Sequence, residues 1–390
     1  MIKLKVEYYG NEHEKMLSKL SCATELTKVV KNGLLIPEQD FLVYSLFREQ
    51  KRMAGWKTYK ELAEKVPSRL EIFNDYFGIE NGYLYSKFSS SNDTDKTMTE
   101  AVGVGTSLSL ASIIYGLTEA DWEKIPVTKN KDLDFQIAST GQEIVELESK
   151  GAIVTNTNYK REISGRANDI HKKKSQQRNK HDNNNTLLGI IATIPITKGQ
   201  ETVCQILDPE GDNIEISPRK YKLLARLLYY YREFRILTRA HFLISLVNRI
   251  QAIQVSEDYD SFDNQPLLNI DNEPFINITP SLKISKSVVE DGLAFGEIIS
   301  LGNNNYYYYG FLFSIIDILI NQGFSNILAF RNNIELPRES NILVHIRRSE
   351  AESFGISESE FEGRQYFEMR MRGQLSITAS GKVIGRCSRV

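Results

Sequence analysis

The sequence predicts a mixed α/β fold, because helical and strand-like patterns alternate in its central part. Residues 98–117 are apolar with many small residues, as in a buried helix, and residues 159–179 are polar and compatible with a helix. Between them, residues 133–150 contain two strand-like runs, and residues 187–196 form an apolar run suited to a buried strand. The predicted order is therefore helix, strand, strand, helix, strand.

A short turn joins the two predicted strands, which cover residues 133–138 and 142–150. The turn consists of Ser139, Thr140 and Gly141, and glycine most readily adopts the positive φ angle that hairpin turns need. We therefore expect an antiparallel hairpin with Gly141 in its turn.

The flanking segments read as separate additions. The N-terminal part opens with a strand, contains a helical pattern at residues 58–66, and ends in a polar run at residues 88–97 that is the best candidate linker. Ser217 before Pro218 predicts the start of a helix that reaches about Ile253 with a break near Thr238. Residues 367–385 look like a terminal hairpin. We accordingly divide the chain into residues 1–95, 96–210 and 211–390.

The composition is that of an ordinary folded protein. At 390 residues, with 41% hydrophobic and 25% charged residues, the chain can bury at least one full core. Lys3 and Lys5 interrupt the opening residues, so we expect no apolar signal segment. The most apolar later stretch, residues 311–320, covers about half a membrane span and contains Asp317, which predicts a core helix and no membrane association.

Three cysteines, Cys22, Cys204 and Cys387, lie far apart and show neither CxxC nor Cys/His spacing. We expect them to be structural core residues rather than disulfide partners or zinc ligands. This usage fits a reducing compartment and predicts a cytoplasmic location.

Charge is segregated along the chain although the formal net charge is only -2. Residues 160–181 hold eight Lys or Arg against two acids, and residues 218–250 hold eight against Glu233. Residues 251–300 reverse the sign, with nine acids against two lysines. The basic segments could form a nucleic-acid-binding face, or they could pair with the acidic segment inside the fold.

The second predicted strand carries an unusual row of charges. Glu146, Glu148 and Lys150 alternate along it, so they share one face of the sheet. Like charges two residues apart repel unless a cation lies between them, and a hard divalent ion with oxygen ligands is the usual solution. Asp134 on the neighbouring strand could reach the same place.

Asp134 followed by Glu148-Ser149-Lys150 resembles the motif of the PD-(D/E)XK nuclease superfamily, although Leu133 stands where the nominal motif has proline. The resemblance implies a restriction-endonuclease-like αβββαβ core, of which two meander strands are recognisable, with N-terminal and C-terminal α/β additions. It implies metal-dependent phosphodiester hydrolysis with Mg²⁺ or Mn²⁺ as cofactor. Asp134, Glu148 and Glu100 would hold the metal, with Glu146 and Lys150 completing the catalytic set.

The resemblance also implies a nucleic-acid substrate, DNA in preference to RNA. In many members the helix after the motif contacts phosphate, and here that helix offers six candidates: Lys172, Lys173, Lys174, Gln176, Gln177 and Arg178. A DNA endonuclease in a restriction or anti-phage defence setting follows as the expected function, with a partner protein or a second copy of the chain as further partners.

Each of these features also has a plainer explanation. Residues 145–151 could be the solvated face of an edge strand, Glu100 could be an acid favourably placed near a helix start, and the basic helix could simply be solvated. The chain could then be a catalytically inactive nucleic-acid-binding or scaffold subunit with a nuclease-like core.

Two further patterns allow structural explanations. The GVGTSL run at residues 103–108 lacks the third glycine of a dinucleotide loop and is better explained by close helix packing. The tyrosine runs at residues 229–231 and 306–309 could stack on bases, but core edges are the commoner role.

Overall fold

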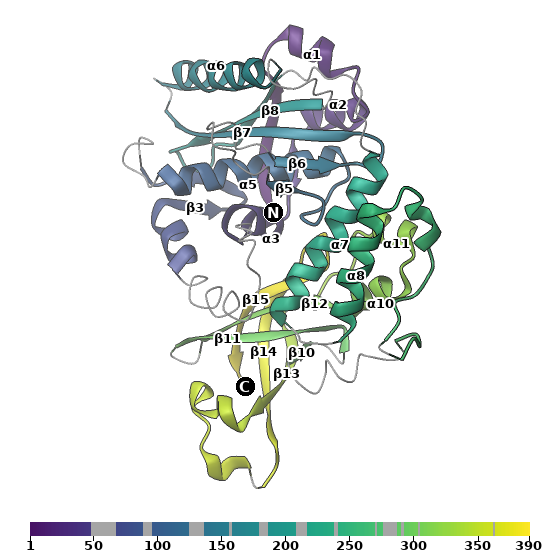
Figure 1. Ribbon diagram of the computed structural model, residues 1–390. Helices are drawn as coiled ribbons and strands as arrows, with labels where there is room; N and C mark the ends of the chain where they lie inside the picture. Colours follow the sequence, from purple (N-terminus) through teal and green to yellow (C-terminus); the bar gives the residue numbers. More distant parts are fainter. Residues whose placement is uncertain are drawn as a thin grey trace. The chain divides into compact units, whose positions relative to one another are not determined.

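The computed structural model describes residues 1–47, 68–88, 96–124, 136–155, 158–178, 186–207, 217–237, 241–269, 271–275, 287–289, 292–302, 305–361 and 363–390. The described residues up to Ala225 form one compact unit, and those from Arg226 onward form a second. Helices and strands occur in both units, which confirms the predicted mixed α/β class (Figure 1).

The first unit contains a seven-stranded sheet in the order β2-β1-β9-β8-β7-β6-β5. An antiparallel meander forms one side: β5 (Glu123–Lys124), β6 (Gln136–Ser139) and β7 (Ile144–Val154). Helix α6 (Tyr159–Arg178) connects β7 to its parallel neighbour β8 (Thr186–Pro195). The other side comprises β9 (Thr202–Leu207), β1 (Ile2–Tyr8) and β2 (Leu34–Ile36).

Helices cover both faces of this sheet. Helix α5 (Lys96–Ile114) packs on the face that carries Val145 and Leu147, within a large apolar core. Helix α6 packs on the other face, where Ile170 contacts a smaller cluster that includes Ile191. Because β7 lies between β6 and β8 and under two helices, its central residues are withdrawn from water.

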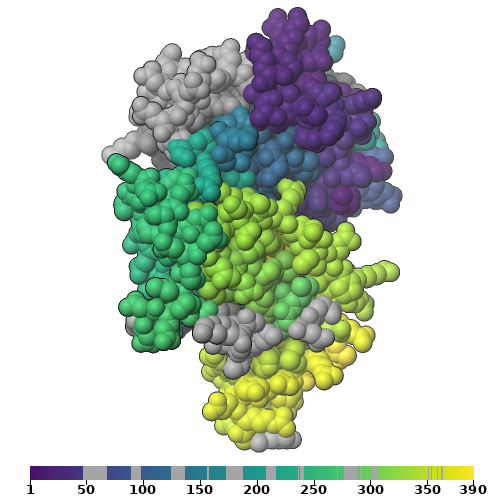
Figure 2. Space-filling model, turned by 90° about the vertical axis from the view of Figure 1, so that its right-hand side faces the viewer, coloured from purple at the N-terminus to yellow at the C-terminus, as the bar shows by residue number. Residues whose placement is uncertain are grey.

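The N-terminal segment belongs to this same unit. It contributes α1 (Asn11–Leu17), α2 (Ala23–Asn32), α3 (Glu38–Leu42), the short π-helix η1 (Val43–Phe47) and the hairpin β3 (Phe77–Glu80) and β4 (Tyr83–Ser86). Both views show the purple N-terminal segment directly beside the blue region around residues 100–150 (Figures 1 and 2).

The predicted domain boundaries differ from this arrangement. The boundary at 95/96 falls inside the first unit, because β1 is hydrogen-bonded to β9 from beyond it. The boundary at 210/211 falls before the described division at Ala225. Residues 89–95 of the predicted linker and the helix predicted at 58–66 lie outside the described residues.

The predicted central elements are otherwise found close to their expected positions. The hairpin turn holds Gly141 at a φ of 98°, as its position predicted. Strand β5 was not predicted, since two residues carry no readable alternation. The meander therefore has three strands where the sequence indicated two.

The glycines of the GVGTSL run serve close packing. A Cβ atom on Gly103 of α5 would lie 2.5 Å from the Cα atom of Gly151, and one on Gly151 would lie 2.5 Å from the carbonyl oxygen of Thr99. Helix and strand backbones therefore touch at this crossing, one residue after Lys150. The interpretation of the run as close helix packing is confirmed.

The second unit contains a closed antiparallel barrel in the order β10-β11-β12-β15-β14-β13. Its strands are β10 (Ser287–Val289), β11 (Ala294–Gly302), β12 (Asn305–Leu312), β13 (Ser340–Arg347), β14 (Tyr366–Ile377) and β15 (Lys382–Arg389). Helix α7 (Pro218–Leu237) belongs to this unit from Arg226 onward. The other helical elements are α8 (Phe242–Val255), η2 (Tyr259–Phe262), α10 (Phe313–Asn321), α11 (Phe324–Ala329), η4 (Arg348–Phe354) and η5 (Glu358–Phe361).

Several predictions for this region are confirmed. Helix α7 begins at Pro218 with the Lys220 amide donating to Ser217 Oγ at 3.4 Å, and α8 ends at Val255, close to the predicted Ile253; the break predicted near Thr238 lies outside the described residues. Strands β14 and β15 form the terminal hairpin. Residues 313–321 are a core helix, although residues 311 and 312 belong to β12. No helix in the described ranges is both long and apolar enough to cross a membrane.

The tyrosine runs are core residues. Tyr308 is fully buried, and a Cβ atom on Gly296 or Gly310 would come within 2.9 Å of its ring. Tyr229 and Tyr230 are also buried and make edge contacts with Phe311 at 6.3 and 6.2 Å. The base-stacking alternative is therefore wrong for these buried tyrosines.

Two arginines of the second basic segment bind backbone carbonyls. Arg226, 1% exposed, donates from Nη1 to the carbonyls of Ile327 and Phe330, which caps the end of α11. Arg249 donates to the carbonyls of Phe262 and Gln265, inside the acidic segment. These two contacts use peptide oxygens rather than the acids that the pairing alternative invoked.

All three cysteines are buried and free, as the structural interpretation predicted. Burial raises the pKa of Cys204 to about 12, and that of Cys387 likewise to about 12. A thiol with so high a pKa is inert, because the thiolate is the reactive form.

Candidate active site

Strand β7 places three of the predicted catalytic residues on one face of the sheet. Glu146, Glu148 and Lys150 occupy alternate positions, while Val145 and Leu147 point into the core beneath α5. Lys150 pairs in register with Ile191, which belongs to the cluster under α6. The charged row therefore lies on the α6 side of the sheet.

Both glutamates of this row are buried. Glu146 is 2% exposed and Glu148 is 0% exposed, while the side chain of Lys150 is 20% exposed. Strand β7 is also flanked by strands on both sides. The alternative in which residues 145–151 form the solvated face of an edge strand is therefore wrong.

Lys150 supplies the positive charge that a buried carboxylate requires. Its Nζ atom lies 2.9 Å from Oε1 of Glu148. This is a charge-assisted hydrogen bond in a region of low dielectric, where it is stronger than at the surface. The pair thus joins a fully buried carboxylate to a lysine side chain that is partly exposed.

A glycine allows α6 to come close to the sheet beside Glu148. Gly189 of β8 pairs in register with Glu148, and a Cβ atom there would lie 2.9 Å from Cγ2 of Ile170. Leu207 closes the same space from β9. The absence of a side chain at position 189 therefore helps to keep water away from Glu148.

The start of α7 fixes the β6–β7 turn at the other end of the row. Ser139 Oγ donates to the carbonyl of Pro218 at 2.6 Å, and Lys222 Nζ donates to the carbonyl of Thr140 at 3.2 Å. Lys222 is only 7% exposed. Sequence reasoning missed this role of α7, because nothing in the spacing of the two segments reveals that they meet.

Glu100 is separated from the other predicted acids. It is exposed on α5, the helix that covers the opposite face of β7. Within the described ranges, no three His, Cys, Asp or Glu side chains form a group that could hold a metal. Glu100, Glu146 and Glu148 therefore do not make a three-carboxylate site by themselves.

Asp134, the first acid of the predicted motif, lies outside the described residues. What the structure describes is two buried carboxylates and one ammonium group on β7. Carboxylate oxygens are the donors that Mg²⁺ takes, but Mg²⁺ usually needs further ligands from substrate, water or another acid.

Strand β5 adds an acid that the sequence did not single out. Glu123 pairs with Ile137, and Ile137 pairs with Glu146, so Glu123 and Glu146 share one face of the sheet. Two strand spacings place their backbones about 10 Å apart. Glu123 was not identified as a candidate from the sequence, because β5 was not predicted.

The predicted phosphate-binding residues all lie in α6. Lys172 is exposed, and the side chains of Lys173, Lys174, Gln176, Gln177 and Arg178 are outside the described part of the structure. The neighbouring His171 stacks on His13 of α1 at a ring separation of 5.9 Å. Helix α1 therefore covers one side of α6 near His171.

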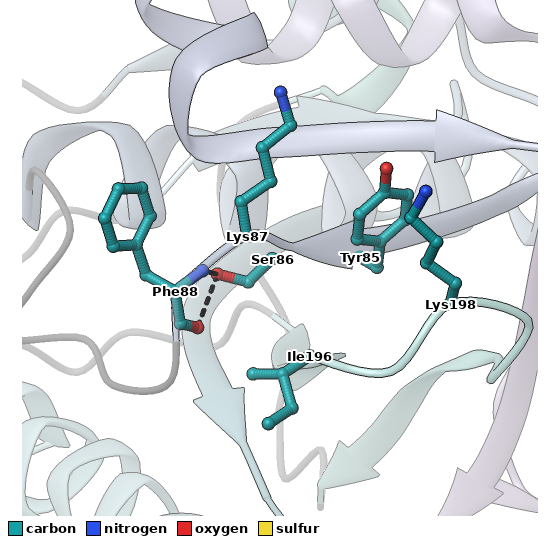
Figure 3. A pocket seen from close by; sticks show the side chains of 6 residues that line it. All are labelled: Tyr85, Ser86, Lys87, Phe88, Ile196 and Lys198. Carbon is teal, nitrogen blue, oxygen red and sulfur yellow. Dashed lines mark hydrogen bonds between the residues drawn. The ribbon is translucent and has the colours of Figure 1, made fainter.

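A separate hollow lies near the end of β8. It measures about 480 Å³ and is lined by Tyr85, Ser86, Lys87, Phe88, Ile196 and Lys198. Figure 3 shows Lys198 beside Tyr85, with its Nζ atom 5.3 Å from the ring centroid. None of the described residues that line this hollow carries a carboxylate, so the hollow is distinct from the acids of β7.

Comparisons of the chain with protein-family models, with curated proteins and with solved structures find no match.

Proposed function

We propose that the first unit is the core of a Mg²⁺-dependent nuclease that hydrolyses phosphodiester bonds, with DNA as its substrate. The observation that carries the proposal is the Glu148–Lys150 pair, in which a fully buried carboxylate is bonded at 2.9 Å to the ammonium group of a partly exposed lysine on the same strand. Placing two charges in the middle of a sheet is costly, so a buried ion pair is weak evidence for a stabilising role and leaves room for a functional one.

The order of elements supports the proposal. Helix α5, the meander β5–β7, helix α6 and the parallel strand β8 follow the αβββαβ order that the resemblance implies. The Glu-Ser-Lys sequence falls on the third strand of the meander, and Glu148 and Lys150 share a face there. A Glu-x-Lys triplet on a surface helix would carry no such argument.

The residues can be given roles on this basis. Glu148 and Glu146 would hold the metal together with Asp134, and the metal would polarise the phosphate and lower the pKa of a water molecule. Lys150, whose side chain is partly exposed, would stabilise the negative charge that develops on the phosphate oxygens. The burial of Glu148 under α6 strengthens both interactions by excluding water.

A restriction or anti-phage defence role is the natural setting for such an enzyme. The support is general: a nuclease core joined to an additional barrel unit suits an enzyme whose substrate is selected outside the catalytic centre.

One observation favours a second candidate, a nucleic-acid-binding or scaffold subunit without activity. Lys150 already neutralises Glu148, and among the described residues no three His, Cys, Asp or Glu side chains form a group that could hold a metal. In that case nucleic acid should bind with strong salt dependence, and Mg²⁺ should change nothing.

The test is cleavage of plasmid and linear DNA, and of RNA, with Mg²⁺, Mn²⁺ or EDTA. We expect metal-dependent cleavage by the parent and a loss of at least about 100-fold in Glu148→Gln and in Lys150→Ala. Circular dichroism checks that each variant folds. Cleavage by Lys150→Ala at the parent rate would reject the proposal, and metal-independent binding without cleavage would favour the second candidate.

Strand β1 offers a matched control. Lys5 and Glu7 form a pair with the same spacing at 2.7 Å, but both side chains are exposed. Lys5→Ala and Glu7→Gln should leave cleavage unchanged, because their charges are solvated and lie three strands from β7 in the sheet order. Equal losses in both pairs would show that the assay reports general destabilisation.

A further inference from the structure

The outer surface of the barrel carries a cluster of arginines. Arg370 and Arg372 lie on β14 and Arg386 lies on β15, and all three are exposed. We call these three residues the arginine face. The intervening residues Met371 and Cys387 are buried, so the alternation of the strands directs the arginines outward.

The register of β14 and β15 brings the three together. Arg370 and Arg372 are two residues apart on one face of a strand, which places their backbones about 7 Å apart. Arg386 pairs with Gln374 and Arg372 pairs with Ser388, so Arg386 is a diagonal neighbour of Arg372 at about 7–8 Å. Three guanidinium groups are thus held on one rigid hairpin.

The arginines outnumber the one acid, Glu368, that the structure describes beside them on this face of β14. Arg370, Arg372 and Arg386 form no ion pair with any described carboxylate, and the acid on the same face, Glu368, lies 3.6 Å from His345. Uncompensated like charges at this spacing repel one another. A polyanion bound across the hairpin would relieve that repulsion.

Nucleic acid fits the arginine face better than an acidic protein does. Arginine binds phosphate through paired N–H donors, and a sugar-phosphate backbone presents regularly spaced phosphates. A stable protein interface needs an apolar centre, whereas Tyr366 is the only large apolar side chain described as exposed on β13, β14 or β15.

We propose that the arginine face binds the phosphate backbone of nucleic acid and supplies affinity outside the catalytic centre. The proposal rests on the proposed function in one respect, the nature of the ligand. It does not depend on catalysis, because binding by the arginines requires no metal. Contacts of this kind position a nucleic acid without reading its sequence.

Fluorescence anisotropy with a labelled DNA duplex, and with its single strand, tests the proposal. Measurements are made in EDTA, in a Glu148→Gln background, so that cleavage cannot interfere. The triple variant Arg370→Ala/Arg372→Ala/Arg386→Ala should bind on the order of 10- to 100-fold more weakly at low salt. The slope of log affinity against log salt should become shallower by about 3.

Two variants serve as controls. Lys15→Ala/Lys19→Ala/Lys31→Ala removes the same charge from exposed positions of the first unit and should leave affinity nearly unchanged. Replacing the three arginines by lysine should restore most of the salt-dependent affinity. If Lys15→Ala/Lys19→Ala/Lys31→Ala lost as much affinity as the arginine variant, the proposal would be overturned, because the change in net charge alone would then explain the effect.

Three outcomes separate the explanations. If the arginine variant binds DNA as tightly as its Glu148→Gln background and the parent cleaves DNA with metal, the arginine face does not bind nucleic acid, and the nuclease proposal stands. If the parent does not cleave with either metal, and the arginine variant but not the Lys15/Lys19/Lys31 variant loses binding, the arginine face stands and the nuclease proposal fails. Stronger binding of poly-glutamate than of either DNA would indicate an acidic protein partner and overturn the proposal.

Discussion

At the scale of single residues, the Glu148–Lys150 pair decides how the site should respond to mutation. Glu148 is wholly buried, and Lys150, 2.9 Å away, supplies a positive charge that helps to stabilise its carboxylate. Removing one partner of a buried pair leaves an uncompensated charge, whereas removing both charges leaves neutral groups of similar size. The two kinds of variant should therefore differ in stability.

We expect Lys150→Met to lower the free energy of unfolding by about 3–5 kcal/mol. The double variant Glu148→Gln/Lys150→Met should recover most of that loss, because the buried charge has gone. Urea unfolding of the parent, both single variants and the double variant gives the coupling energy directly.

The exposed pair Lys28–Glu25 provides the comparison, since its atoms lie 2.6 Å apart with more than half of each side chain in water. Lys28→Met should change the free energy of unfolding by less than about 1 kcal/mol. A Lys150→Met variant as stable as the parent would mean that Glu148 is neutral or otherwise compensated, and our account of the pair would be wrong.

At the scale of elements, the sequence could predict what depends on local pattern. Alternation along residues 144–150 indicates that Glu146, Glu148 and Lys150 share a face, and Gly141 marks the turn before them. Burial of the pair could not be predicted, because it depends on α6 closing over Gly189 from outside the strand. The pairing of β1 with β9 could not be predicted either, since the residue pattern of a strand does not identify the strand that it pairs with.

The crossing of α5 over β7 leads to a prediction about packing. A Cβ atom on Gly103 would lie 2.5 Å from backbone atoms of Gly151, which cannot move aside as a flexible side chain could. We expect Gly103→Ala to lower the free energy of unfolding by about 1–3 kcal/mol, because helix and strand must separate. Chemical denaturation measures the change.

Gly165 of α6 is the matched control, because a Cβ atom there meets nothing within 4 Å. Gly165→Ala should stabilise the protein by up to about 1 kcal/mol, as alanine favours a helix interior over glycine. If both substitutions shift stability in the same direction and by the same amount, helix propensity rather than the backbone contact governs position 103.

At the scale of the whole molecule, the two proposals place the metal ion in the first unit and a metal-independent contact with the nucleic-acid backbone in the second. The carboxylates of β7 belong to the first unit, and the arginine face belongs to the second. Each unit has its own sheet, so ligand effects on one can be measured separately from effects on the other. Hydrogen exchange is suited to this, because bound ligand suppresses local opening where it binds.

We expect Mg²⁺ alone to slow amide exchange in peptides that cover Ile144–Val154 and to leave those that cover β14 and β15 unchanged. A ligand at about 100 times its dissociation constant stabilises the bound state by about 2.7 kcal/mol, which slows exchange through the affected openings about 100-fold. Duplex DNA in EDTA should instead slow exchange in β14 and β15, because the arginines bind phosphate without metal.

Glu148→Gln distinguishes a specific metal effect from a general one. The substitution removes the charge of a carboxylate that we propose as a metal ligand and leaves the arginine face intact, so the Mg²⁺ response should disappear while the DNA response in β14 and β15 remains. Mass spectrometry of the same peptides measures both responses in one experiment. Protection of the barrel by Mg²⁺, or an unchanged Mg²⁺ response in Glu148→Gln, would contradict the assignment of the metal to the β7 carboxylates.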